Sequence, residues 1–105
     1  MQKEVDLSAY HNAILLSVFT PYISQFAQVR LFGSRVKGCA KTGSDIDLVI
    51  VGLKDNRILS QLQAALEESA LPVYSTVIAY EDITSKSFLQ QIDDTSVPLI
   101  EGSID

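Results

Sequence analysis

The chain has 105 residues, of which 47% are hydrophobic and 20% charged, with a formal net charge of −5 and a single cysteine. This composition predicts one small globular domain over residues 1–105, neither disordered nor held together by disulfides. The acidic balance argues against general nucleic-acid binding, which depends on lysine and arginine neutralising phosphates. Without a membrane-spanning apolar run or a signal peptide pattern, the expected location is the cytoplasm, with no membrane partner.

The first half of the chain predicts one helix and two strands. Apolar spacing indicates an amphipathic helix from residue 7 to about residue 20, where Pro21 ends it, and a turn or kinked helical piece follows. Residues 29–32 read as a short strand, and residues 34–38 are long enough for about one helical turn. Residues 46–51 are almost wholly apolar and β-branched, which predicts a central strand covered on both faces.

The second half predicts two helices and two extended segments. Asp55 is a good capping residue for a helix over residues 56–69, and residues 73–80 form a third predicted strand. A short helix that ends at Gln91 and an extended segment over residues 97–100 complete the pattern. This order predicts an α/β fold in which a small mixed β-sheet carries helices packed on it.

Two aspartates stand at the start of the predicted central strand. Asp45 and Asp47 are two positions apart, so both side chains project to the same side of the sheet if the strand includes Asp45. Carboxylates this close repel each other unless a cation lies between them. Mg²⁺ suits such a pair, because it takes one or two protein carboxylates together with waters and substrate phosphates. In isolation, however, an Asp-x-Asp pair is more often a solvated strand end.

A glycine, a serine and several cations lie just before this pair. Gly33 and Ser34 follow a predicted strand, where unpaired backbone N–H groups can hold a phosphate and the missing side chain of Gly33 permits close approach. Arg35, Lys37 and Lys41 form the only dense cationic cluster in an acidic chain. Arg35 and Lys37 lie nearest the turn. For both of them, a phosphate contact and simple solubility on an exposed turn are equally good explanations. Together with the aspartate pair, the cluster predicts a phosphate and metal site.

The run Gly33-Ser34-Arg35-Val36-Lys37-Gly38, followed by Ser44-Asp45-Ile46-Asp47-Leu48, resembles the signature of the minimal nucleotidyltransferases of the polymerase-beta superfamily. The resemblance implies a nucleotidyltransferase fold and the transfer of a nucleoside monophosphate from ATP to an acceptor hydroxyl. It implies Mg²⁺ at Asp45 and Asp47. It also implies nucleotide binding by Gly33, Ser34, Arg35, Lys37 and Ser44. Proteins of this kind often act as antitoxins to a helical protein of the HEPN class encoded beside them, so the resemblance implies such a partner. Whether the chain also forms a homo-oligomer is an open alternative.

The family's third carboxylate is missing from this sequence. Matching the segment after the long helix places Thr76 where that acid belongs, and threonine is neutral and a poor base. Neither Glu81 nor Asp82 reaches the same metal from its place further along the strand. The glutamates of the preceding helix are expected to face solvent. Natural loss of activity, a deliberate substitution and an error in the matched register all remain open.

Two functions therefore compete. One is an enzyme that modifies a partner protein, with activity impaired by Thr76. The other is a catalytically inactive nucleotide-binding or partner-binding module that neutralises a HEPN-type partner by forming a complex. The aromatic side chains are expected to pack in the core or at its rim rather than stack on a base, and these are Tyr22, Phe26, Tyr74 and Tyr80.

Overall fold

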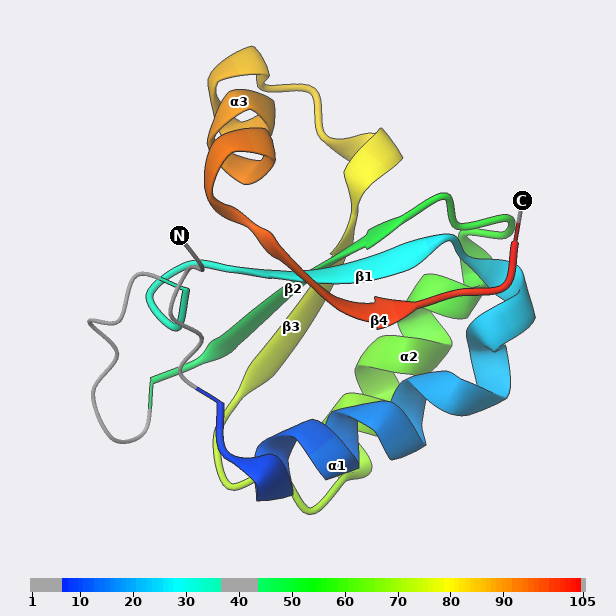
Figure 1. The fold of residues 1–105 in the computed structure, drawn as a ribbon. Helices are drawn as coiled ribbons and strands as arrows, with labels where there is room; N and C mark the ends of the chain where they lie inside the picture. Colours follow the sequence, from blue (N-terminus) through cyan, green and yellow to red (C-terminus); the bar gives the residue numbers. More distant parts are fainter. Residues whose placement is uncertain (1–6, 37–43, 105) are drawn as a thin grey trace.

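A computed structural model of the chain describes residues 7–36 and 44–104 (Figure 1). The helices are α1 (Ala9–Phe19), α2 (Arg57–Glu68) and α3 (Lys86–Thr95), with short 3₁₀ helices η1 (Thr20–Gln25) and η2 (Tyr80–Asp82). The strands are β1 (Gln28–Phe32), β2 (Ile46–Val51), β3 (Ser75–Ala79) and β4 (Val97–Glu101).

The four strands form one mixed sheet in the order β3-β2-β1-β4. Strand β1 is antiparallel to both β2 and β4, whereas β2 and β3 are parallel. A parallel pair requires a crossover connection, which α2 supplies between β2 and β3. The predicted α/β class with a small mixed sheet is therefore confirmed.

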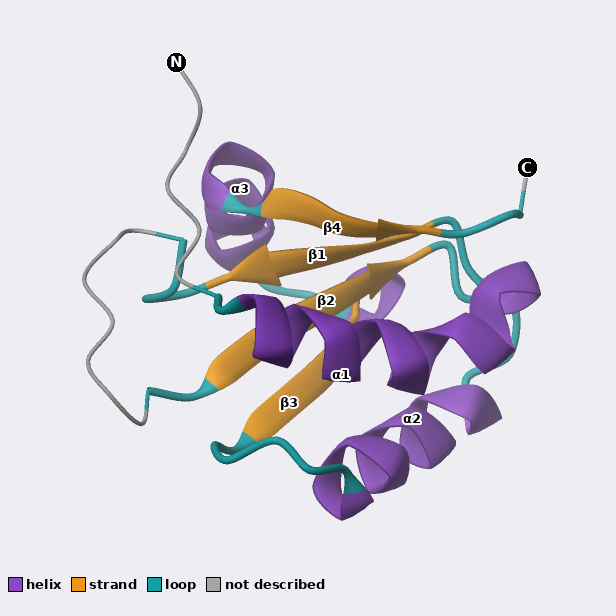
Figure 2. Cartoon of the chain, turned by 60° about the horizontal axis from the view of Figure 1, so that its bottom comes forward, coloured by secondary structure: helices purple, strands orange, loops and turns teal. Residues whose placement is uncertain are grey.

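Different helices pack on the two faces of the sheet. Helices α1 and α2 pack side by side on one face, and α3 lies on the other (Figures 1 and 2). Alternate residues of β1 and β2 point toward α1 and α2 and form the main core, among them Val29, Leu31, Leu48 and Ile50, all fully buried. On the opposite face α3 packs its Phe88 edge-on against Phe32 of β1.

Most predicted elements occur where the pattern placed them. Strand β2 spans the predicted residues, and Pro21 lies at the start of the 3₁₀ helix η1 that follows α1. The third helix does not end at Gln91, as predicted, but at Thr95. The extra turn buries Ile92, which extends the apolar stripe of the helix by one repeat. Strand β3 is shorter than predicted at both ends, because it begins at Ser75 rather than at residue 73 and Tyr80 already belongs to η2.

In the parts of the chain that the structure describes, no helix combines the length and the apolar character needed to cross a membrane.

Candidate active site

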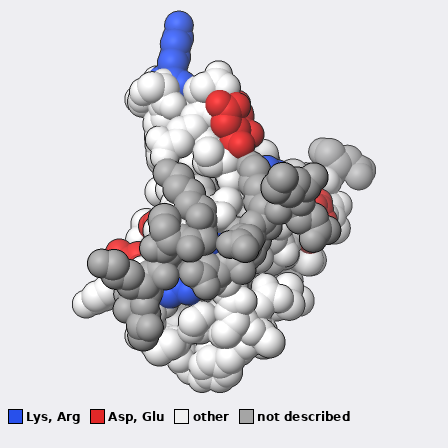
Figure 3. Space-filling model, turned by 60° about the vertical axis from the view of Figure 1, so that its left-hand side comes forward, with Lys and Arg blue, Asp and Glu red and all other residues white. Residues whose placement is uncertain are grey.

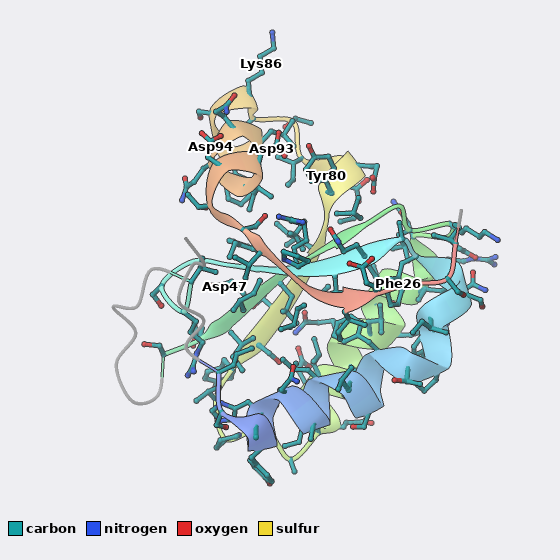
Figure 4. All side chains as sticks on the ribbon, in the orientation of Figure 1. Phe26, Asp47, Tyr80, Lys86, Asp93 and Asp94 are labelled. Carbon is teal, nitrogen blue, oxygen red and sulfur yellow. The ribbon has the colours of Figure 1, made fainter. Side chains whose placement is uncertain are left out.

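The aspartate pair lies at the start of β2. The strand begins at Ile46, so Asp45 stands just outside it and Asp47 is its second residue. Ile46 and Leu48 point into the core, and the alternation therefore turns Asp47 toward the face that carries α3. Asp45 is exposed and Asp47 half-buried. Asp47 and Phe26 lie at opposite ends of the sheet (Figure 4).

The two carboxylates interact electrostatically. Burial raises the pKa of Asp47 above its ordinary value, and the neighbouring charge of Asp45 raises it further. Among the described residues, neither carboxylate forms a hydrogen bond or an ion pair. In the space-filling view of this end of the molecule, an acidic patch and an extended cationic side chain both lie on the part formed by α3 (Figure 3). A divalent cation would neutralise both carboxylates, and their oxygens are ligands that Mg²⁺ favours.

The Gly-Ser turn lies directly against Asp47. Gly33 has a φ of +83°, in the left-handed region, and a Cβ added to it would lie 2.6 Å from Oδ2 of Asp47. The N–H of Val36 donates to the carbonyl of Gly33 at 3.1 Å, which closes a turn over the predicted start of the helical segment. The turn and the carboxylate thus meet at one point, and only a residue without a side chain fits there.

Arg35 ties this turn to the aspartate pair. Its side chain is only 6% exposed, and its Nε and Nη2 donate to the carbonyl of Ser44 at 3.1 and 2.7 Å. Residue 44 immediately precedes Asp45, so the guanidinium connects the two halves of the motif. Ser34 and Ser44 are both half-buried beside it. Lys37, expected as a phosphate neighbour, and Lys41 of the same cationic cluster lie outside the described residues.

Thr76 stands beside Asp47 on the neighbouring strand. The two Cα atoms are partners in the parallel β2–β3 pairing, so their side chains share one face, and Thr76 is exposed. A carboxylate at position 76 would therefore lie beside that of Asp47, whereas the threonine adds no charge there. The other candidate acids are engaged at the far end of β2. Glu81 accepts hydrogen bonds from the N–H of Gly52 at 3.1 and 3.2 Å, and Asp82 accepts from Asn56.

Among residues 7–36 and 44–104, the carboxylates at the candidate site are those of Asp45 and Asp47. Over the described residues, no three histidine, cysteine, aspartate or glutamate side chains gather closely enough to hold a metal ion. An ion bound at Asp45 and Asp47 would need its remaining ligands from water and substrate, which is the usual pattern for Mg²⁺ at a phosphate.

A residue of α2 that sequence reasoning missed supports the strand under Thr76. The side-chain amide of Gln63 donates to the carbonyl of Ser75 at 2.9 Å and accepts from the N–H of Val77 at 3.0 Å. These two groups flank Thr76 on the free edge of β3. Nothing in the sequence signals this contact, because a polar residue on a helix normally faces solvent.

A small mixed sheet whose Gly-Ser turn abuts a carboxylate pair is the architecture of a nucleotidyltransferase. The chain belongs to the family described as Polymerase beta, Nucleotidyltransferase, whose sequence model matches residues 15–105. No curated protein matches the sequence.

The fold is shared with several solved structures, among them the following three. A toxin–antitoxin complex with AMP-PNP has a TM-score of 0.69 and 21% identity, covering 88% of this chain and 74% of that chain. The toxin–antitoxin MntA–HepT has a TM-score of 0.65 and 19% identity, with coverages of 90% and 73%. A mutant of the toxin–antitoxin MntA–HpeT, with two aspartates two positions apart replaced by glutamate, has a TM-score of 0.66 and 18% identity, with coverages of 88% and 74%.

Proposed function

We propose that this chain is a single minimal nucleotidyltransferase domain that binds Mg-ATP and transfers its nucleoside monophosphate to a hydroxyl on a partner protein, as the antitoxin of a toxin–antitoxin pair. The observation that carries the proposal is the contact between the Gly33 turn and the carboxylate of Asp47. It brings backbone N–H groups suited to phosphate and carboxylates suited to Mg²⁺ to one point.

In this proposal the nucleotide is held by the Gly-Ser turn, by Arg35, Lys37 and Ser44, and by the aspartate pair through Mg²⁺. Gly33 and Ser34 hold the triphosphate, and Asp45 and Asp47 hold Mg²⁺. Arg35 and Ser44 keep the turn and the aspartate pair in register through their hydrogen bonds, and they also lie next to the phosphates. The bound metal would neutralise charge on the phosphates.

The transfer joins the acceptor oxygen to the α-phosphorus of ATP, and the bond from that phosphorus to the bridging oxygen breaks, so that pyrophosphate leaves. The acceptor hydroxyl must give up its proton during this step. Thr76, at the position of the missing acid, is not a base at neutral pH. We therefore expect the chain to bind nucleotide but to transfer it slowly.

The fold comparisons support the choice of nucleotide and partner. One similar structure is a toxin–antitoxin complex with AMP-PNP, an ATP analogue, and another is the toxin–antitoxin MntA–HepT. We infer that ATP is the nucleotide and that a helical HEPN-class protein encoded nearby is the partner that carries the acceptor hydroxyl.

Thr76 also favours a second function. An exposed threonine in place of a carboxylate, next to an otherwise complete motif, fits a domain that has lost transfer and acts by binding. Such a module would neutralise its HEPN-type partner by forming a complex, with or without nucleotide.

Calorimetric titration with ATP, with and without Mg²⁺, tests the nucleotide site. We expect Mg²⁺-dependent binding that is lost in Asp45→Asn/Asp47→Asn. A matched control, Asp93→Asn/Asp94→Asn, removes the same charge from α3 and should bind as the wild type does. Binding that survives the first double substitution, or no binding by the wild type, would contradict the proposal.

The substitution Thr76→Asp separates the two functions. If position 76 lacks only a base, Thr76→Asp should raise the rate of nucleotide transfer to the purified partner by about 100-fold or more. The measurement is incorporation of label from α-³²P-ATP, with Thr76→Asn as the uncharged control. An unchanged rate in Thr76→Asp would leave the binding module as the better account.

A further inference from the structure

Tyr74 is the most exposed of the large hydrophobic side chains that the structure describes. Its side chain is 82% exposed, compared with 59% for Tyr10 and 41% for Leu16. The expectation that Tyr74 packs in the core or at its rim is therefore wrong. An aromatic ring on the surface offers a flat apolar face on which a planar group can stack.

The backbone places Tyr74 beside the aspartate pair. Its carbonyl accepts a hydrogen bond from the N–H of Ile46 at 2.9 Å, so the β2–β3 pairing continues past the formal start of β3. Ser75 is buried, and alternation along an extended chain turns Tyr74 to the side that Thr76 also occupies. Tyr74 and Asp45 thus lie opposite each other at the same end of the sheet.

A cavity adjoins this tyrosine. Its volume is about 430 Å³, within the range of small-ligand sites. It lies between the end of α2 and the start of β3, and its lining residues are Leu66, Glu67, Leu71, Pro72, Val73, Tyr74 and Ser75. The cavity borders α2, on the face of the sheet opposite Asp47 and Thr76, so it lies apart from the surface beside the aspartate pair.

We propose that the nucleobase of the bound nucleotide stacks on the exposed ring of Tyr74, on the face of the sheet that carries Asp47 and Thr76. The inference rests on the proposed function, because it needs the triphosphate at Gly33–Ser34 and the metal at Asp45 and Asp47. Stacking on an aromatic ring accepts any base, and the larger surface of a purine favours ATP and GTP over CTP and UTP. Tyr74 is then the residue that converts a phosphate site into a nucleotide site.

Two ligands distinguish base contacts from phosphate contacts. Calorimetry of the full chain with Mg-ATP reports both, whereas Mg-tripolyphosphate reports the phosphate and metal contacts alone. We expect Tyr74→Ala to weaken Mg-ATP about tenfold and to leave tripolyphosphate binding unchanged. Tyr74→Phe, which keeps the ring and removes the hydroxyl, should bind both ligands as the wild type does.

Tyr10→Ala provides the matched control, because it removes an exposed tyrosine from α1, on the other face of the sheet. It should leave both affinities unchanged. Unaltered Mg-ATP binding by Tyr74→Ala, or an equal loss of both ligands, would overturn the stacking role while leaving the proposed function intact. A wild type that binds neither ligand would refute the proposed function, and the inference would fail with it.

Discussion

Gly33 occupies a position where a backbone turn and a carboxylate compete for the same space. Its positive φ excludes most residues on backbone grounds, and Oδ2 of Asp47 fills the volume that a side chain would need. Gly52 shares the positive φ, but its added Cβ would meet Ala27 at 2.9 Å, at the end of β2 remote from Asp47. The two glycines therefore form a natural pair for separating backbone strain from damage to the site.

We predict that Gly33→Ala and Gly52→Ala both lower the free energy of unfolding, by about 1–3 kcal/mol, because both force alanine into a left-handed conformation. Only Gly33→Ala should abolish Mg-ATP binding, since it displaces the Asp47 carboxylate. Urea unfolding and calorimetry on the two variants measure both effects. Equal loss of ATP affinity in the two variants would show that stability, not the contact with Asp47, controls binding.

Asp47 should destabilise the metal-free fold at neutral pH. Its pKa is raised in the folded state, so ionisation is harder there than in the unfolded chain, and the folded state loses stability as pH rises through the titration. We predict that Asp47→Asn raises Tm by a few degrees at pH 7 in EDTA. The gain should vanish at low pH, where the wild-type carboxyl is also neutral. Thermal scans across pH measure this, and an unchanged Tm at pH 7 would contradict it.

At the scale of residues, motif spacing along the chain could be predicted from the sequence, whereas contacts between distant segments could not. The spacing of Asp45 and Asp47 and the glycine before a turn could be found by pattern, because strand alternation and backbone freedom are local properties. The burial of Arg35 against Ser44 and the exposure of Tyr74 depend on how segments distant in sequence come together. No local pattern contains that information.

Strand β3 forms an edge of the sheet, and α2 protects it. The amide of Gln63 occupies the carbonyl of Ser75 and the N–H of Val77, as a neighbouring strand would. An unprotected edge of this kind invites pairing with other chains. Thr76 lies between these two bonded backbone groups, so the Gln63 hydrogen bonds also fix the backbone of Thr76.

We predict that Gln63→Met lowers the free energy of unfolding by about 1–2 kcal/mol, because it leaves two half-buried backbone groups without protein partners. Amide exchange at Val77 should accelerate more than exchange at Leu48 of the central strand. Ala64→Met, which introduces the same side chain at an exposed position of the same helix, should change neither quantity. Equal exchange rates at Val77 in the Gln63→Met variant and the wild type would exclude the protective role.

The existence and type of the helices and strands were largely predictable from the sequence. The bounds of β2 follow from an apolar run without interruption, and Pro21 marks the boundary between α1 and η1. The errors concern ends that tertiary packing decides: the last turn of α3 exists because Ile92 is buried, and β3 stops where η2 begins. The strand order was not predicted, since pairing across the sheet leaves no periodic trace along the chain.

For the whole molecule, ligand binding and stability should be linked. A ligand that binds only the folded state adds about 2.7 kcal/mol when its free concentration is about 100 times Kd. For a domain of this size the corresponding increase in Tm is on the order of 10 °C. We predict such a shift with Mg-ATP, and none in Asp45→Asn/Asp47→Asn. A shift that persists in the double variant would place the nucleotide elsewhere on the molecule.

The pairing of β1 with β4 has a consequence for the order of assembly during synthesis. Gln28 of β1 pairs with Glu101 of β4, 73 residues later, and β4 is made after every other described element. Until β4 has left the ribosome, one edge of β1 has no strand to pair with, although every residue of the candidate site already exists. We expect closure of this long-range pairing to limit the folding rate, because distant contacts form slowly. The nascent chain would thus contain all residues of the candidate site before β4 completes the sheet that supports them.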